Sequence, residues 1–214
     1  MSRAPLPVAV LVSGFGSNFQ ALLDATAAGR LNAQFRLVGA DRSDAFGLER
    51  ARQAGIPARC LPPAAYSDRG AWNAALGQLL ADSGAELVVL AGFMRVLADE
   101  LVHDWRGRML NIHPALLPLH RGLHTHRRAL EAGDRVHGAS IHYVTEELDG
   151  GPVILQARVP VLPGDDEANL ARRVQLREHE IYPQAVSWVA DGRLEWRDDE
   201  PWLDGRRLLR PVVV

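Results

Sequence analysis

Short apolar runs alternate with segments of helical periodicity over the first half of the chain, and this alternation limits the possible folds most. The runs fall at residues 7–12, 35–40, 58–61, 86–91 and 108–113. The helical segments between them fall at about 19–28, 45–54, 69–84 and 97–105. Apolar runs rich in Val are typical of strands buried on both faces. Strands joined in turn by helices form a mostly parallel sheet that helices cover on both faces.

The second half follows a different pattern. Residues 123–132 and 165–191 have helical periodicity, while 139–144 and 153–161 are apolar runs without a long helix between them. We therefore expect these two runs to form an antiparallel addition to the sheet. We interpret the Trp-containing tail that follows as packing. No linker or repeat divides the chain, so we predict one Rossmann-like α/β domain over residues 1–214.

Composition excludes several kinds of function. All 24 basic residues are Arg, which removes mechanisms that need a lysine amine. The net charge of −2 does not suggest nucleic-acid binding, and no apolar run approaches the ~20 residues that span a bilayer. The single cysteine, Cys60, excludes an internal disulfide and fits a reducing compartment. We expect a cytoplasmic protein with no nucleic-acid or membrane partner.

A glycine-rich turn joins the first predicted strand to the first predicted helix. It reads Ser13-Gly14-Phe15-Gly16-Ser17-Asn18. Glycine lets a backbone approach a ligand, and the free N–H groups at a helix N-terminus attract anions. Phe19 occupies the third small position of a dinucleotide fingerprint, and Asp41 lies beyond the ~20 positions of that pattern. A monophosphate or similar anion is favoured, with a purely structural turn and a dinucleotide as the alternatives.

Two polar residues share one side of the fifth predicted strand. Asn111 and His113 are two positions apart, so their side chains project together, opposite Ile112. The carboxyl end of a strand in an open α/β sheet is where ligands bind. An Asn amide suits an oxyanion, and an imidazole exchanges a proton near neutral pH. The alternative is a pair of polar side chains that serve only the end of the strand.

A carboxylate lies in the connection between the two antiparallel runs, where Asp149 precedes Gly150, Gly151 and Pro152. A solvated tight turn is one interpretation. If Asp149 instead faces His113, it raises the pKa of the imidazole and orients the ring. Asn, His and Asp together can stabilise an oxyanion and move a proton during acyl transfer to an amine. No Ser or Cys nucleophile is evident, so we expect the amine to attack directly.

Metal binding is a further possible role for two of the histidines. His124 and His126 are spaced so that both could bind a metal, but no third clear ligand accompanies them. We therefore expect no metal and assign these histidines positioning or surface roles.

Six short motifs occur together in this chain. They are the glycine-rich turn at 13–18, Asp-Ala-Phe-Gly-Leu-Glu-Arg-Ala at 44–51, Ala-Gly-Phe-Met-Arg at 91–95, Asn-Ile-His-Pro-Ala-Leu-Leu-Pro at 111–118, Gly-Leu-His-Thr-His at 122–126 and Leu-Asp-Gly-Gly-Pro at 148–152. In combination they resemble the folate-dependent formyltransferases, and within them the members that act on glycinamide ribonucleotide. The resemblance extends from about residue 8 to residue 202. Two departures are Phe15, where a small polar residue is usual, and Leu-His-Arg-Gly at 119–122.

The resemblance implies the formyltransferase fold and a reaction. The amine of N1-(5-phospho-D-ribosyl)glycinamide would attack the formyl carbon of 10-formyltetrahydrofolate, in the third step of de novo purine synthesis. Asn111 and protonated His113 would stabilise the oxyanion, while Asp149 would raise the pKa of His113 and relay the amine proton. A 10-formyltetrahydrofolate hydrolase, with water as the acceptor, and a non-catalytic nucleotide-binding or folate-binding module are the alternatives.

The resemblance also implies which residues bind each substrate. The ribonucleotide would contact Gly16, Ser17, Asn18, Phe19 and Glu178. The folate would contact Arg69, Met94, Arg95, Val96, Leu97, Asn111, Val144, Thr145 and Glu146. The half at about 1–106 would bind the ribonucleotide and the half at about 107–214 would contain the catalytic and folate-binding residues. No metal is implied, and we expect a monomer or a weak homodimer.

Overall fold

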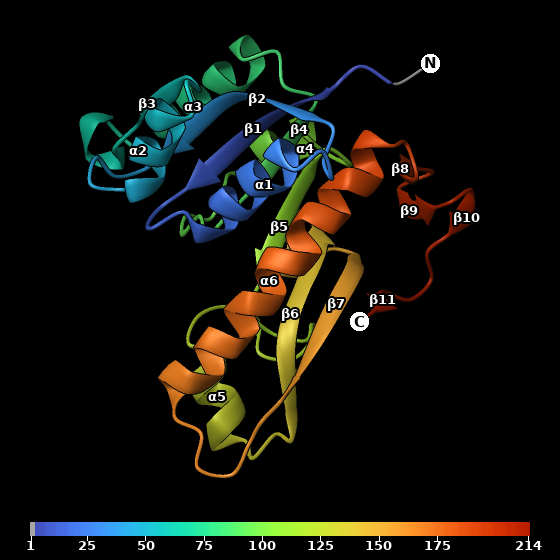
Figure 1. Ribbon diagram of the computed structural model, residues 1–214. Helices are drawn as coiled ribbons and strands as arrows, with labels where there is room; N and C mark the ends of the chain where they lie inside the picture. Colours follow the sequence, from blue (N-terminus) through green and yellow to red (C-terminus); the bar gives the residue numbers. More distant parts are fainter. Residues whose placement is uncertain (1–2) are drawn as a thin grey trace.

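A computed structural model describes residues 3–214 (Figure 1). Its first half contains β1 (Leu6–Val12), α1 (Ser17–Ala27), β2 (Ala33–Ala40), α2 (Phe46–Gln53), β3 (Ala58–Cys60), η1 (Pro63–Ala65), α3 (Arg69–Asp82), β4 (Leu87–Leu90), α4 (Asp99–Asp104) and β5 (Met109–His113). Its second half contains α5 (Thr125–Glu131), β6 (Val136–Tyr143), β7 (Val153–Pro160), α6 (Glu167–Ala190), β8 (Leu194–Arg197), β9 (Glu200–Leu203), β10 (Arg206–Arg207) and β11 (Val212–Val213). Every strand and helix predicted from the sequence is present, with ends shifted by up to three residues.

The main sheet has its strands in the order β11-β7-β6-β5-β4-β1-β2-β3. The strands from β3 to β5 along this order are parallel. β6 pairs antiparallel with β5, and β7 pairs antiparallel with β6, which confirms the predicted antiparallel addition. The order reverses at β1, which has β2 on one side and β4 on the other. Ligands of open α/β sheets bind at such a reversal, outside the carboxyl ends of the strands.

Helices cover both faces of the sheet, as predicted. Along β1, Val8, Val10 and Val12 belong to one hydrophobic core, whereas Ala9 and Leu11 belong to the other. The first core lies beneath α1, α2 and α6, and the second lies beneath α3 and α4. Because both faces of β1 are fully buried, its run is apolar without polar alternation.

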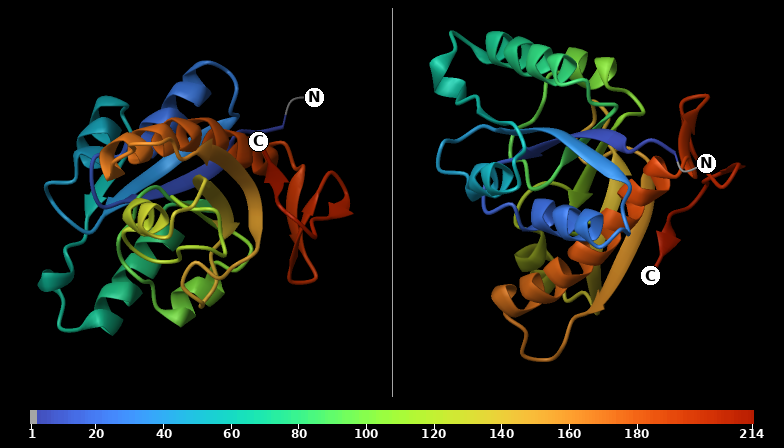
Figure 2. Two further views of the ribbon diagram at one scale, coloured as in Figure 1. Left: turned by 90° about the horizontal axis from the view of Figure 1, so that it is seen from below. Right: turned by 45° about the horizontal axis from the view of Figure 1, so that its top comes forward.

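The tail contains strands that the sequence pattern did not predict. β8, β9 and β10 form a separate antiparallel sheet, and β11 pairs in parallel with β7 at the rim of the main sheet. Figure 2 shows this small sheet at the side of the molecule, away from α2 and α3. These strands are two to four residues long, too short to show a period of two. The turn between β8 and β9 consists of Asp198 and Asp199, both of which have positive φ although neither is glycine.

Helix α6 ties the two halves of the sheet together. It runs across β6 and β7 and alongside α1 (Figure 1). Its N-terminus is capped by Asp166, whose carboxylate accepts from the backbone N–H of Asn169 at 2.7 Å. Farther along, the fully buried hydroxyl of Tyr182 shares its proton between the carbonyls of Leu90 at 2.9 Å and Leu110 at 3.1 Å. The helix is thereby fixed to β4 and β5. Within residues 3–214, no helix combines the length and apolar character needed to cross a bilayer.

Replacing Tyr182 with Phe tests this connection. The substitution keeps the ring but removes a donor from two buried carbonyls, so we expect the free energy of unfolding to fall by about 1–3 kcal/mol. Chemical denaturation monitored by circular dichroism measures this change. Tyr66→Phe is the matched control, since the structure gives the Tyr66 hydroxyl no hydrogen bond within residues 3–214. An equal loss in both variants would show that the Tyr182 hydroxyl does not stabilise the fold.

Candidate active site

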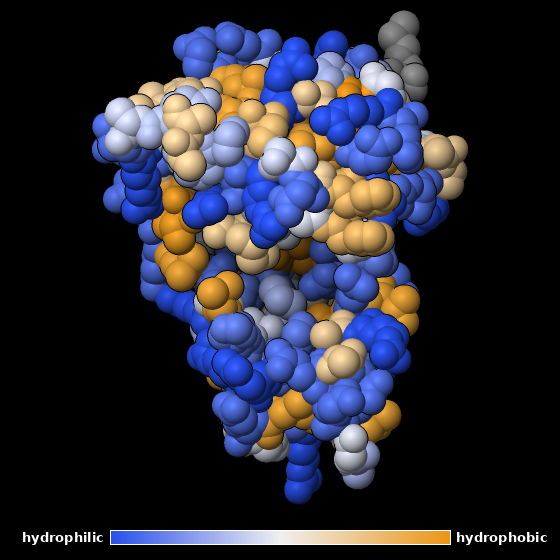
Figure 3. Space-filling model, turned by 90° about the vertical axis from the view of Figure 1, so that its left-hand side faces the viewer, coloured by the Kyte–Doolittle hydropathy of each residue, from blue (hydrophilic) through white to orange (hydrophobic). Residues whose placement is uncertain are grey.

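A cavity of about 500 Å³ opens at the carboxyl ends of the central strands. It is lined by Asn111 and His113 of β5, by Asp149, and by residues 92–96 and 122–126. Figure 3 shows this side of the molecule, which is hollowed at mid-height. The exposed apolar side chains of Met94, Leu123 and Leu148 lie around the opening. The cavity therefore combines an apolar rim with polar groups at its base.

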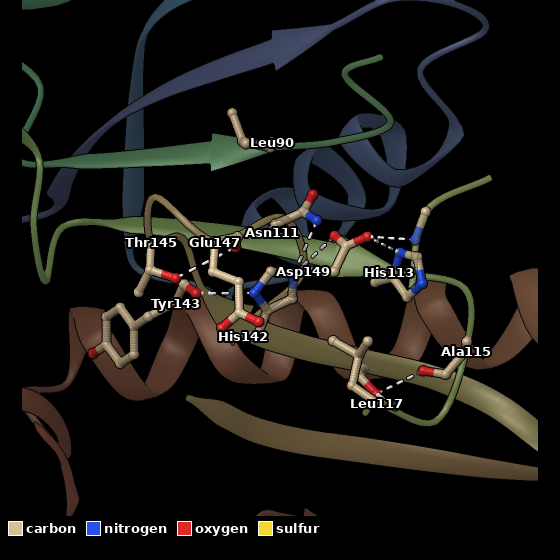
Figure 4. A network of polar contacts seen from close by, with 12 residues as sticks. Leu90, Asn111, His113, Ala115, Leu117, His142, Tyr143, Thr145, Glu147 and Asp149 are labelled. Carbon is tan, nitrogen blue, oxygen red and sulfur yellow. Dashed lines mark hydrogen bonds and ion pairs between the residues drawn. The ribbon is translucent and has the colours of Figure 1, made fainter. Parts of the chain in front are cut away.

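Strand pairing brings Asn111 to a histidine. In the β5–β6 register Asn111 lies opposite His142, and its Nδ2 is 3.0 Å from His142 Nε2 (Figure 4). His142 Nδ1 lies 2.9 Å from the backbone carbonyl of Tyr143, which can only accept. Nδ1 therefore carries the proton, and Nε2 accepts from the Asn111 amide. The second N–H of that amide remains to meet a ligand oxygen.

His113 is only 5% exposed and has an oxygen atom beside each ring nitrogen. Nε2 donates to the backbone carbonyl of His120 at 3.0 Å, and Nδ1 lies 3.4 Å from Asp149 Oδ2. Burial lowers the pKa of His113 below its ordinary value, while Asp149 and the His120 carbonyl act in the opposite direction. The predicted effect of Asp149 on the imidazole is thus present, but desolvation outweighs it.

The connection between β6 and β7 aims Asp149 at the two histidines. Asp149 has φ +50°. Its Oδ2 accepts from the backbone N–H of Gly122 at 2.8 Å, and its Oδ1 lies 3.7 Å from His142 Nε2. Glycine is required at position 151, because a Cβ there would lie 1.9 Å from the carbonyl oxygen of Tyr143. Gly151 thus allows the connection to fold back closely against the end of β6.

The pKa of Asp149 reflects two opposing influences. Burial raises it, but the hydrogen bond from the Gly122 N–H and the proximity of His142 and His113 lower it by more. The net result is a pKa below the ordinary value, so the carboxylate is ionised at neutral pH. Asp149 is accordingly a buried anion beside His113, able to accept a proton only transiently.

The glycine-rich turn leads into α1 through Gly16, which has φ +72°. Asn18 Nδ2 donates to Glu178 Oε2 at 2.9 Å, and Gln175 Nε2 donates to Ser17 Oγ at 3.1 Å. Both partners come from α6, so the turn and the helix form one polar surface. Burial raises the pKa of Glu178, against the lowering effect of Asn18.

Two buried polar atoms, one on α1 and one on α6, have no hydrogen-bond partner within residues 3–214. They are Asn18 Oδ1 and His179 Nε2. Such atoms are costly unless a ligand or water meets them. His179 is a residue that the sequence analysis did not single out, although it follows Glu178 directly. Phe19 differs from expectation, because its side chain is fully buried and packs edge-on against Phe35. Only its backbone faces the turn.

The residues predicted to bind folate line adjoining cavities. Met94, Arg95 and Val96 line the main cavity, and Leu97, Val144, Thr145 and Glu146 line a neighbouring one of about 100 Å³. Arg69 lines a third space of about 470 Å³, with Met94, Arg95 and Val96. Arg95 Nε is 2.6 Å from the buried Asp41, and Arg69 Nη2 donates to the carbonyls of Val96 and Leu97. Both arginines are thus held at the cavity wall.

A histidine network lies behind His113. His120 Nε2 is 2.6 Å from Asp134 Oδ2, and His126 Nδ1 is 3.1 Å from His137 Nε2. Burial lowers the pKa of His137 to about 4. His124 and His126 do not form a metal site with other residues, since the described part of the chain has no group of three or more His, Cys, Asp or Glu suited to a metal. Sequence reasoning missed His120, because its contribution to His113 comes from its backbone.

Known proteins are similar to this chain over most of its length. Residues 6–186 match the model of the family described as formyl transferase. The phosphoribosylglycinamide formyltransferase of Escherichia coli strain K12 is 53% identical over 201 residues, which cover 94% of this chain and 95% of that protein. The human trifunctional purine biosynthetic protein adenosine-3 is 44% identical over 188 residues, 88% of this chain and 19% of that protein. A solved phosphoribosylglycinamide formyltransferase from Coxiella burnetii superposes with a TM-score of 0.94 and 45% identity, covering 98% of this chain and 99% of that one. The chain therefore belongs to the formyl transferase family.

Proposed function

We propose that this enzyme transfers the formyl group of 10-formyltetrahydrofolate to the amine of N1-(5-phospho-D-ribosyl)glycinamide. The products are the formylglycinamide ribonucleotide and tetrahydrofolate, in the third step of de novo purine synthesis. The observation that carries the proposal is the meeting of Asn111, His113 and Asp149 at the base of one cavity. The glycine-rich turn adjoins the cavity wall, where Ser13 Oγ accepts from the Met94 amide at 2.8 Å.

The chemistry follows from these three side chains. The amine nitrogen attacks the formyl carbon, and the carbonyl oxygen becomes an oxyanion. The free N–H of Asn111 and an N–H of His113 donate to that oxygen, and His113 turns from the His120 carbonyl to do so. Asp149 stabilises the imidazolium and accepts the amine proton through water. The bond from the formyl carbon to the folate nitrogen then breaks, and that nitrogen takes up a proton.

The substrates occupy different parts of the surface. Gly16, Ser17, Asn18 and Glu178 hold the ribonucleotide, with Phe19 contributing its backbone; the unpartnered Asn18 Oδ1 supports this placement. The folate lies along Arg69, Met94, Arg95, Val96, Leu97, Asn111, Val144, Thr145 and Glu146, where the cavities adjoin. The half at about 1–106 thus binds mainly the ribonucleotide, and the half at about 107–214 contains the catalytic groups. The proposed reaction uses one domain and no metal.

We further infer that the enzyme works in the cytoplasm on these small molecules, as a monomer or a weak homodimer. A reducing compartment suits the single half-buried Cys60. The net charge of −2 gives no general attraction to nucleic acid or anionic membranes.

Formation of tetrahydrofolate from 10-formyltetrahydrofolate, followed with and without the ribonucleotide, tests the reaction. We expect folate product only when the ribonucleotide is present, together with the formylated amide. Equal rates of folate and formate release without the ribonucleotide would instead identify a hydrolase, with water as the acceptor. The names of the relatives, which are phosphoribosylglycinamide formyltransferases, favour the first outcome.

Asp149→Asn keeps the size of the side chain and removes its charge. We expect kcat/KM to fall by at least ~10²–10³-fold, because the amine proton loses its acceptor and the imidazolium its counter-charge. Steady-state kinetics measures this loss. Asp198→Asn, on the exposed turn between β8 and β9, makes the same chemical change far from the cavity and should retain full activity. Near wild-type turnover by Asp149→Asn would disprove the catalytic assignment.

The same variant should change the titration of His113. The negative charge of Asp149 raises the pKa of His113, so its removal leaves burial to lower the pKa further. Nuclear magnetic resonance of the imidazole follows the titration. We expect a midpoint below 6.5 in the wild-type protein and a lower one in Asp149→Asn, so the imidazolium population falls at every pH near the midpoint. A midpoint that rises in the variant would contradict the proposed coupling.

Ser17→Asp tests the ribonucleotide site. A carboxylate at the start of α1 would repel the ribonucleotide phosphate, so we expect the KM for the ribonucleotide to rise at least about tenfold. The KM for the folate should stay within about twofold, since Ser17 lies outside the cavities lined by the folate residues. Unchanged ribonucleotide affinity would place the phosphate elsewhere.

A further inference from the structure

The carbonyl groups of the glycine-rich turn are held by α2. Gly47 N–H donates to the carbonyl of Gly14 at 3.1 Å, and Arg50 Nε donates to the carbonyl of Phe15 at 3.0 Å. Both carbonyls are therefore directed toward α2. Carbonyl oxygens repel a phosphate, whereas the N–H groups of such a turn attract it. Because these carbonyls are directed toward α2, the turn can present its N–H groups, rather than its carbonyl oxygens, to a phosphate.

The turn and α2 also pack without free space between them. A Cβ at Gly16 would lie 2.8 Å from Gly47 Cα, and a Cβ at Gly47 would lie 2.7 Å from Val12 Cγ2. The N-terminus of α2 is therefore wedged between the end of β1 and the turn. Any change in the position of α2 moves the turn with it.

Arg50 of α2 connects this helix to both the glycine-rich turn and α1. Its Nη1 donates to Gln20 Oε1 of α1 at 2.7 Å, while Nε holds the Phe15 carbonyl. Its guanidinium carbon lies 4.6 Å from the ring centre of Phe15 and 4.9 Å from that of Phe46. Within residues 3–214 no carboxylate lies within ion-pair distance of Arg50, in contrast to Arg52 on the same helix, which pairs with Glu49. The Arg50 charge is thus not neutralised beside the turn.

We propose that Arg50 is a positioning residue for the phosphate of the ribonucleotide, an inference that rests on the proposed function. It fixes the Phe15 carbonyl and the first turn of α1 with one rigid guanidinium, so that the N–H groups of the turn face the phosphate. Phe15 and Phe46, which are stacked at a ring distance of 5.3 Å, cover the guanidinium and keep it in place. The fork geometry of Arg is essential, because the planar guanidinium holds its Nε and Nη1 donors in fixed directions, whereas a lysine ammonium is a point charge on a flexible stem.

Three variants on α2 test the proposal: Arg50→Ala, Arg50→Lys and the control Arg52→Ala. We expect the KM for the ribonucleotide to rise about tenfold in Arg50→Ala, the loss of roughly one hydrogen bond to a charged group. The KM for 10-formyltetrahydrofolate and kcat should stay within about twofold. Arg50→Lys should resemble Arg50→Ala, and Arg52→Ala should resemble the wild type. A rise in both KM values together with a large fall in Tm would show a merely structural role and overturn the proposal, as would full rescue by Lys, which would mean that only the charge matters.

Inorganic phosphate separates this proposal from the proposed function. Its dissociation constant is measured by isothermal titration calorimetry on the whole wild-type chain and on Arg50→Ala. A similar, about tenfold weakening in Arg50→Ala supports the positioning role, even if the formyl acceptor proves to be another phosphorylated amine. Equal phosphate affinity in the two proteins overturns the role of Arg50 while leaving the formyl transfer assay unaffected. Absence of phosphate binding to the wild type also overturns it.

Discussion

The antiparallel pairing of β6 against β5 is the constraint on which the rest of the site depends. β5 is parallel to β4 on one side and antiparallel to β6 on the other. Because β6 runs antiparallel to β5, His113 at the carboxyl end of β5 lies opposite Ser140 of β6. The same pairing also sets Asn111 opposite His142 and starts the connection that contains Asp149. A one-residue slip of β6 would reverse the side of every one of its side chains and separate these groups.

Burial and charge act against each other throughout this site. Desolvation lowers the pKa of His113 and raises that of Asp149, in each case opposing the charged form. Proximity acts against desolvation, because each group favours the ionised state of the other. The net effect of burial differs between the two groups. For Asp149, the Gly122 hydrogen bond and the nearby histidines outweigh burial, so its pKa falls. For His113, burial outweighs the effect of Asp149, so its pKa also falls. Because burial and the Asp149 charge act on His113 in opposite directions, its protonation depends on both.

Much of this arrangement could be predicted from local sequence. The apolar runs and helical segments of the first 191 residues correspond to real elements, because both faces of the strands are buried and the period is clear. The shared side of Asn111 and His113 also followed from their spacing on one strand, whereas the residues alone left the position of Asp149 open and the family resemblance implied its role. The His120 carbonyl could not be predicted, since it depends on a positive φ at a residue that rarely adopts one. The net direction of the His113 pKa depends on burial by residues distant in sequence. The short strands of the tail carry no periodic signal at all.

The edge strands of the main sheet affect the behaviour of the protein in concentrated solution. One edge strand is β3, with three residues, and the other is β11, with two. The tail covers the middle of β7, where Val214 N–H donates to the carbonyl of Gln156 and the Val214 carbonyl accepts from Arg158. Long, flat edge strands with free backbone groups pair with strands of other chains and lead to aggregates. By ending the sheet in two such short strands, the chain leaves little template for another copy to join, which disfavours intermolecular β-pairing at high concentration.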